Sequence, residues 1–130
     1  MTPFYKLRVA RPSKDLQKTL AFYSNALGLD QISHFEHHDA FSGIMLGKKD
    51  WPYHFEFTKH ATHAILPTPT QEDLIVFYVP EKEEWEQLTQ KIERLGHRPV
   101  TSLNPYWDLN GKTYEDPDGY RVVIQNAQWG

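Results

Sequence analysis

The sequence predicts an α+β protein in which one β-α-β-β-β unit occurs twice. In each copy a strand runs into a proline, and an amphipathic helix follows and ends at a glycine. The two copies share one offset, because Pro12 and Pro80 are 68 positions apart, as are Gly28 and Gly96. Such a repeat within 130 residues predicts one domain, 1–130, with two modules related by a pseudo-two-fold axis.

The first module is expected over about residues 3–60. Its opening strand, 7–12, ends at a proline, and Ser13 is the expected N-cap of the helix that follows. The apolar stripe of this helix is formed by Leu16, Leu20, Tyr23 and Leu27. Gly28 suits the left-handed position after the helix. Three segments of strand composition come next, at 31–39, 41–46 and 53–58.

The second module is expected over about residues 73–128, after a proline-containing linker at about 61–72. Its first strand, 74–79, precedes a helix whose start is rich in glutamate. The stripe of this helix is formed by Trp85, Leu88, Ile92 and Leu95, and the helix stops at Gly96. The expected strands after it are 98–103, 111–115 and 120–125.

The last two strands form a hairpin around Asp116-Pro117-Asp118-Gly119. Asp at the first position, Pro at the second and Gly at the fourth are typical of a type I turn. The two aspartates also resemble part of a calcium-binding cluster, but the turn accounts for all four residues. The sequence therefore predicts a hairpin here and not a cation site.

Two features of the sequence restrict the function classes: the single helix of each module and the amino-acid composition. A module with one helix cannot cover both faces of its sheet, so we expect the other face to curve around a cavity. Aromatic residues make up 14% of the chain, which suits a core or a pocket for a flat ligand. The absence of cysteine excludes thiolate metal sites, and a net charge of -3 disfavours nucleic acid as a partner. Without a signal peptide or a membrane-spanning apolar run, we expect a cytoplasmic protein that does not bind membranes.

Four strings of residues resemble the vicinal-oxygen-chelate superfamily, which includes glyoxalase I, extradiol dioxygenases, and bleomycin and fosfomycin resistance proteins. They are RVARPSKDLQKTLAFYSNALGL, HFEF at 54–57, NPYW at 104–107 and YEDPDGYRVVI at 114–124. The resemblance covers nearly the whole chain. It implies paired βαβββ modules with curled mixed sheets, ligands bound inside the curls, and assembly as a homodimer.

The resemblance also implies four positions for metal ligands, one on the first and one on the last strand of each module. Glu56 fills one of them with a carboxylate. The first-strand position falls at Arg8, or at Lys6 in the alternative alignment, and both are cations. In the second module the positions fall at Leu74 and Val123, which cannot bind a metal. We therefore expect no metal ligands and no cofactor.

The candidate site is polar at one end and aromatic at the other. Strand alternation places His54 and Glu56 on one face and Tyr53, Phe55 and Phe57 on the other, and we expect the first pair to face inward. His54 and Glu56 are the candidate catalytic residues. The expected ligand-binding residues are Arg8, His54, Glu56, Trp107, Tyr114 and Arg121. The alternative, that Arg8 and Glu56 form only a structural cross-strand ion pair, stays open.

The function expected from these residues and the resemblance is metal-free binding of a small molecule, such as sequestration of an antibiotic or metabolite. One alternative is a glyoxalase-like lyase or isomerase, or a dioxygenase, with Zn, Ni, Mn or Fe on a non-standard ligand set such as His34, His54 and Glu56. Another is a metal-free enzyme with Glu56 or His54 as the general base. The sequence identifies neither the ligand nor a reaction, nor whether one chain or a dimer closes the cavity.

Overall fold

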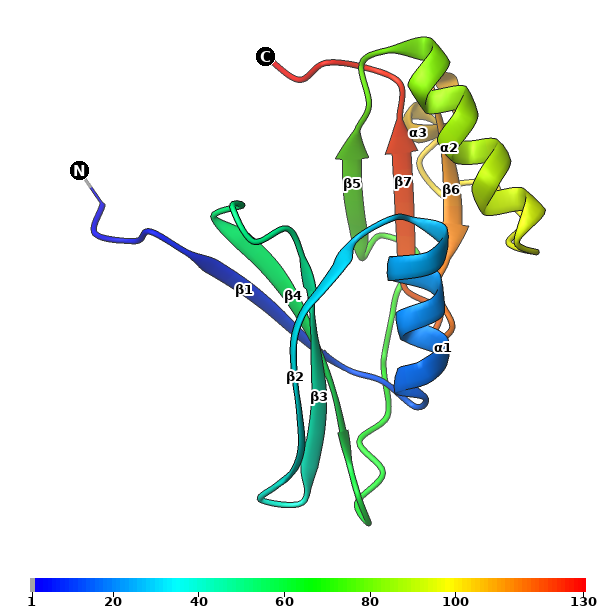
Figure 1. Ribbon diagram of the computed structural model, residues 1–130. Coiled ribbons are helices and arrows are strands. Elements are labelled where there is room, and N and C mark those ends of the chain that lie inside the picture. The colour runs from blue at the N-terminus through cyan, green and yellow to red at the C-terminus, as the bar shows by residue number, and fades with distance from the viewer. Residues whose placement is uncertain (1) are drawn as a thin grey trace. The chain divides into compact units, whose positions relative to one another are not determined.

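The computed structural model describes residues 2–130, which form two compact units with a boundary between Pro67 and Thr68 (Figure 1). Each unit contains one mixed sheet, of four strands in the first unit and three in the second. Helices occur in both units, and the predicted α+β class is confirmed.

The first unit has the predicted β-α-β-β-β order. Its elements are β1 (Leu7–Pro12), α1 (Leu16–Leu20) with its π-helical continuation η1 (Ala21–Ala26), β2 (Asp30–His38), β3 (Phe41–Gly47) and β4 (Tyr53–His60). The strand order in the sheet is β1-β4-β3-β2. β1 is parallel to β4, whereas β2, β3 and β4 are antiparallel neighbours. The first strand of the module therefore pairs with its last strand and forms one edge of the sheet.

The first helix begins two residues later than predicted. Asp15 is the N-cap, because its Oδ1 accepts hydrogen bonds from the backbone N–H groups of Gln17 and Lys18 at 3.0 and 3.1 Å. Ser13 is buried instead, and its hydroxyl shares a 2.7 Å hydrogen bond with the hydroxyl of Thr19. The prediction of Ser13 as N-cap was therefore wrong. Its hydroxyl instead bonds the side chain of Thr19 and so connects the end of β1 to the helix.

The buried face of the first helix differs from the predicted stripe. Leu16, Leu20 and Leu27 are only partly buried. From Ala21 onward the chain widens into η1, where Leu27 donates to the carbonyl of Phe22 five residues earlier, so the 3.6-residue period ends there. The completely buried apolar residues of this segment are Phe22, Tyr23 and Ala26. Tyr23 stacks on Phe57 of β4 at a centroid distance of 4.8 Å. The helix thus covers the face of the sheet that carries Phe57.

The second unit contains β5 (Leu74–Tyr78), α2 (Lys82–Arg94), α3 (Tyr106–Leu109), β6 (Gly111–Glu115) and β7 (Arg121–Gln125). The strand order is β5-β7-β6, with β5 parallel and β6 antiparallel to β7. Every residue of β7 is buried. Trp85 of α2 fastens the helix to the sheet, because its indole N–H donates to the carbonyl of Ile124 at 2.8 Å.

The strand predicted at residues 98–103 was wrong. This segment makes only an isolated bridge between Val100 and Thr113. Pro99 has no backbone N–H to donate, and the N–H of Ser102 bonds the carboxylate of Asp108, at 3.1 Å to the nearer oxygen. The segment therefore cannot continue a ladder beyond the bridge. Both predicted helix ends are confirmed, with positive φ values of 88° at Gly28 and 96° at Gly96.

The hairpin between β6 and β7 is confirmed. Gly119 donates its N–H to the carbonyl of Asp116 at 3.0 Å, as a type I turn requires. The Oδ1 atom of Asp116 accepts from the N–H groups of Asp118 and Tyr120, both at 2.9 Å. Since the Asp116 side chain is buried and bonds its own turn, it stabilises the hairpin.

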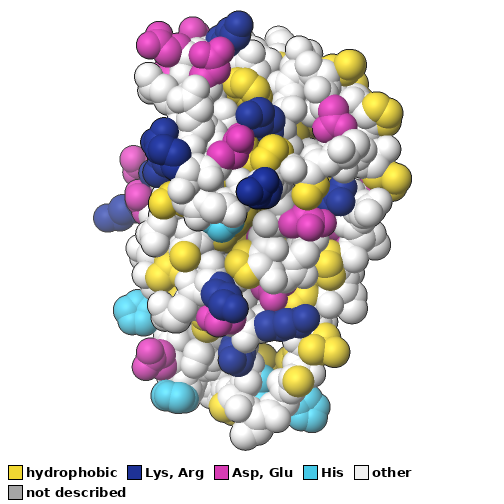
Figure 2. Space-filling model, turned by 90° about the vertical axis from the view of Figure 1, so that its right-hand side faces the viewer, with side chains coloured by type: hydrophobic (Ala, Val, Ile, Leu, Met, Phe, Trp, Pro, Cys, Tyr) yellow, Lys and Arg dark blue, Asp and Glu magenta, His cyan; other side chains and the backbone are white. Residues whose placement is uncertain are grey.

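Charges of both signs are interspersed on the face of the molecule that Figure 2 displays. Such a mixture does not give that face the single-sign field that attracts phosphate backbones, in keeping with the net charge of -3. Among the helices within residues 2–130, none combines the length and the apolar character that a membrane-spanning helix needs.

Replacing Asp116 tests the role of the turn in stability. Asp116→Ala leaves two backbone N–H donors without their acceptor, so we expect a loss of about 1–3 kcal/mol in the free energy of unfolding. Asp50→Ala, in the exposed turn before β4, is the matched control and should cost less than about 0.5 kcal/mol. Urea unfolding followed by tryptophan fluorescence measures both. Equal effects of the two substitutions would show that the buried carboxylate does not stabilise the hairpin.

Candidate functional site

The two faces of the sheet in the first unit differ in chemistry. Phe55 and Phe57 of β4 are buried on the face that the helix covers. His54 and Glu56 alternate with them and lie on the opposite face. The register places Met45 of β3 beside Glu56. This second face, which we call the open face of the first sheet, therefore carries an imidazole and a carboxylate.

Arg8 of β1 bonds both groups. Its Nε donates to Nε2 of His54 at 2.9 Å, and its Nη1 contacts Oε2 of Glu56 at 3.2 Å. The parallel register explains this geometry, because Arg8 pairs with His54 and the next residue on the same face pairs with Glu56. The side chain of Arg8 is 47% exposed and that of Glu56 is 14% exposed. One guanidinium thus joins the two candidate catalytic groups at the surface of the open face.

Burial and neighbouring cations lower the pKa of His54. Burial has the largest effect, the positive charges of Arg8 and Lys6 follow, and the negative charge of Glu56 acts in the opposite direction. Because Nε2 accepts a hydrogen bond from Arg8, the neutral imidazole carries its hydrogen on Nδ1. His54 could therefore accept a proton from a bound molecule only if Arg8 moved away from Nε2. Glu56 is contacted at Oε2, which leaves lone pairs of its carboxylate to accept a proton.

The donor groups on the open face do not fit a divalent metal. Nε2 of His54 and the carboxylate of Glu56 already accept from Arg8, whose positive charge would repel a cation. His34 does not complete a ligand set, because it pairs with Ile44 on the face that the helix covers. The set of His34, His54 and Glu56 is therefore wrong. Across residues 2–130, no three His, Asp or Glu side chains converge as metal ligands.

Tyr114 does not line an open surface. It is completely buried, and its hydroxyl donates to Oε2 of Glu93 in α2 at 2.8 Å. Burial and the neighbouring carboxylate both raise the pKa of Tyr114. A hydrogen bond from Lys112, also at 2.8 Å, lowers the pKa of Glu93. The expectation that Tyr114 contacts a ligand does not fit this packing, because the residue belongs to the core between sheet and helix.

Arg121 and Trp107 also lie in the second unit. Arg121 is almost completely buried, and it donates to Glu115 and to the carbonyl of Thr101, both at 3.2 Å. Arg121 therefore connects the loop that contains Thr101 to the hairpin of β6 and β7. Trp107 is partly exposed in α3 and packs edge-to-face against Tyr106 at 4.9 Å. Ligand binding by Trp107 stays a prediction.

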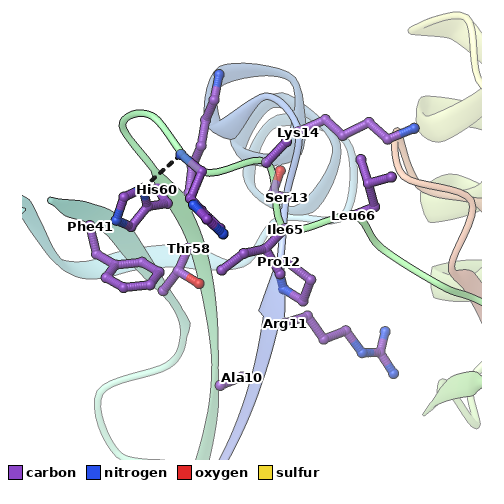
Figure 3. Close-up of a pocket in the computed structure, with 13 residues that line it drawn as sticks. Ala10, Arg11, Pro12, Ser13, Lys14, Phe41, Thr58, His60, Ile65 and Leu66 are labelled. Atoms are coloured by element: carbon purple, nitrogen blue, oxygen red, sulfur yellow. Dashed lines mark hydrogen bonds between the residues drawn. The ribbon is translucent and has the colours of Figure 1, made fainter.

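The sequence analysis missed a cavity of about 310 Å³ in the first unit (Figure 3). It lies where β1 and β4 end, and residues 63–66 form part of its wall. The sequence predicts a linker at about 61–72, which includes this segment, because of Pro67 and Pro69. The signal in the sequence was the apolar run Ala64-Ile65-Leu66, close to His60 and His63. A linker exposed to solvent needs neither an apolar run nor two histidines.

Comparison with known proteins identifies close relatives of the whole chain. Residues 7–58 match the YycE-like N-terminal domain, and residues 72–126 match the YycE-like C-terminal domain. The uncharacterized protein YycE of Bacillus subtilis (strain 168) is 39% identical over 123 residues, which are 95% of this chain and 88% of that protein. A crystal structure of a YycE protein of unknown function from Bacillus subtilis gives a TM-score of 0.92 at 38% identity, covering 98% of this chain and 93% of the other.

More distant structures share the fold. Glyoxalase I of Leishmania major has a TM-score of 0.73 at 14% identity, with 98% of this chain and 88% of that chain covered. An antibiotic-binding protein from Streptomyces sp. CB03234 has a TM-score of 0.68 at 13% identity, with 98% and 99% covered. At these identities the likeness concerns the fold alone. It confirms the vicinal-oxygen-chelate architecture that the sequence motifs predict.

The electrostatics of the open face predict opposite effects of two substitutions on His54. Arg8→Gln removes a positive charge and a donor to Nε2, so the pKa of His54 should rise. Glu56→Gln removes a negative charge, so that pKa should fall. Titration of the imidazole Cε1–H resonance by NMR measures both shifts. Lys49→Gln, an exposed change in the turn before β4, is the control and should have little effect. Shifts of the same sign in the two variants would contradict the arrangement.

Proposed function

The chain belongs to the YycE-like family of the vicinal-oxygen-chelate superfamily, and we propose that it is a small-molecule-binding protein that works without a metal. The proposed binding surface is the open face of the first sheet. One observation carries this proposal: Arg8 occupies Nε2 of His54 and Oε2 of Glu56 and places a positive charge beside both groups, which disfavours a metal there. The guanidinium of Arg8 has further N–H donors and the carboxylate of Glu56 has further lone pairs, so the pair can bond an organic ligand.

The surroundings of these groups suit a small organic ligand. Small-molecule sites combine mostly apolar walls with a few polar groups that fix orientation. Here Met45 and Ala10 flank Glu56 on the neighbouring strands, and the cavity at the ends of β1 and β4 continues the same face. A ligand would lie on apolar side chains while Arg8 and Glu56 orient its polar atoms. Sequestration of an antibiotic or metabolite is the activity that such a surface supports without further catalytic groups.

Metal titration tests the metal-free part of this proposal. We expect protein purified without a histidine tag to hold substoichiometric Zn, Ni, Mn and Fe, and to bind added Ni²⁺ weakly in calorimetry. Arg8→His replaces the repelling cation with a third N/O donor beside His54 and Glu56, so nickel affinity should rise by at least about 10-fold. Arg8→Met removes the cation without adding a donor and is the control. Tight, stoichiometric metal in the wild-type protein would contradict the proposal.

We also propose that two copies of the chain associate through the N-terminal edge of the first sheet. Phe4, Tyr5 and Leu7 are 83%, 87% and 60% exposed, which is unusual for neighbouring large apolar residues. They line an apolar hollow together with Pro52 and Tyr53. β1 itself is an edge strand, and such an edge can pair with a second chain. A second copy is the occupant that would cover both features at once.

Sedimentation velocity tests this association. We expect a dimer for the wild-type protein. Leu7→Lys should weaken it by at least about 10-fold, because a buried charge would replace an apolar contact. Leu109→Lys alters another exposed leucine, in α3, and should leave the dimer intact. A wild-type monomer at all concentrations, or equal effects of the two substitutions, would contradict an interface at β1.

A further inference from the structure

We propose that the cavity at the ends of β1 and β4 binds an uncharged molecule, which has an apolar body and one hydroxyl or carbonyl group. We call it the apolar cavity, and the side chains that define it are those of Ala10, Pro12, Phe41, Thr58, Ile65 and Leu66. The inference rests on the proposed function, because it names the class of molecule that the open face of the first sheet receives. Three observations carry it: the direction of the lining side chains, the hydroxyl of Thr58 and the way in which the wall is held.

The open face supplies the apolar part of the lining. On β4, Thr58 lies two residues beyond Glu56 and therefore on the same face. On β1, Ala10 pairs with Glu56 and Pro12 pairs with Thr58. Phe41 reaches the same face from β3. The strand register thus brings the ring of a proline, the ring of a phenylalanine and the methyl group of an alanine around one threonine.

The positively charged side chains near the cavity point away from it. Arg11 pairs with Phe57, which is buried under the helix, so the side chain of Arg11 starts on the helix-covered face. Lys59 follows the same alternation. Figure 3 shows Arg11 and Lys14 extending away from the cluster around Pro12, and both have interaction partners. Because the described lining contains no aspartate or glutamate either, an ion of either sign would lose hydration there without gaining a paired charge.

The wall formed after β4 contains a neutral imidazole and is held by specific hydrogen bonds. Nδ1 of His60 accepts from the backbone N–H groups of Thr62 and His63, at 3.2 and 2.8 Å. Only the neutral imidazole offers such an acceptor, so this geometry adds no charge to the lining. The His60 ring also packs edge-to-face on Phe41 at 4.9 Å. The cavity is therefore preformed, which lowers the entropic cost of binding.

The hydroxyl of Thr58 is the polar group that can orient a ligand in this apolar surrounding. The backbone carbonyl of Thr58 accepts from Ser13 at 2.8 Å, but within residues 2–130 the hydroxyl has no hydrogen-bond partner. In Figure 3 Thr58 lies between Phe41 and Pro12. Since a hydroxyl both donates and accepts, it can bond an alcohol or a carbonyl group without a charge on the ligand.

The segment after β4 leaves apolar surface for a ligand to cover. Ile65 and Leu66 are 48% and 64% exposed, and both line the cavity. An apolar body that covers them is stabilised by the removal of this surface from water. The volume of about 310 Å³ is at the low end of the range for small-molecule sites, so a substituted benzene is of suitable size.

The test uses three probes with one skeleton, 4-phenyl-1-butanol, 4-phenylbutyrate and 4-phenylbutylamine. At about pH 8 the first is neutral, the second an anion and the third a cation, while ordinary imidazoles are neutral. We expect the alcohol to bind at least about 10-fold more tightly than either ion. Amide chemical shifts in a ¹H–¹⁵N spectrum locate the probe, and the largest changes should fall at residues 10–13 and 58–66. Equal or tighter binding of either ion would overturn the uncharged class.

Replacing the hydroxyl of Thr58 isolates the polar contact. Thr58→Val keeps the shape of the side chain and should weaken the alcohol about 3- to 10-fold, because one hydrogen bond is lost. Thr62→Val removes a hydroxyl from the exposed segment after β4, outside the lining, and is the matched control that should retain the affinity. The same spectrum verifies that both variants fold. Equal affinities of the two variants would overturn the role of the Thr58 hydroxyl.

The location of the shifts separates this inference from the proposed function. If the alcohol moved the amides of Arg8, His54 and Glu56 and left residues 58–66 unchanged, the apolar cavity would be rejected while binding on the open face would stand. If none of the three probes bound, the inference would fail, whereas the metal titration of wild-type protein and Arg8→His would still decide the metal-free part of the proposed function independently.

Discussion

The contact of the Arg8 guanidinium with both His54 and Glu56 determines the chemistry of the first sheet. It depends on the parallel pairing of β1 with β4, which brings the first strand of the module beside its last. As a partly exposed ion pair it contributes no more than about 1 kcal/mol to stability. Its importance is chemical, because it occupies Nε2 of His54 and Oε2 of Glu56 and adds a positive charge beside both groups.

The open face and the cavity at the ends of β1 and β4 meet at Ala10. Ala10 pairs with Glu56 and also lines the cavity, so the ion pair and the cavity are neighbours along β1. Phe55 and Phe57 pack on the other face of the sheet, under the helix. The core of the first unit therefore lies on that face and not on the open face. A binding surface of this kind needs neither a metal nor a catalytic group to hold a small molecule, and it resembles ligand sites with few polar anchors.

Much of the fold could be predicted from the sequence. Some residue patterns fit only one backbone conformation, and these were sufficient to predict the Asp116–Gly119 turn and the helix ends at Gly28 and Gly96. The strand at 98–103 could not be excluded, because the competition of Asp108 for the N–H of Ser102 is a tertiary contact. Likewise, alternation placed His54 and Glu56 correctly on one face, but it could not show that Tyr114 would bond Glu93 in the core.

The most direct test of the central claim is anomalous diffraction from crystals grown in excess Zn²⁺, with data collected on both sides of the zinc absorption edge. We expect no anomalous peak between His54 and Glu56, with the Arg8 guanidinium still in contact with both. A strong peak bound by Nε2 of His54 and the carboxylate of Glu56, with Arg8 displaced, would contradict it.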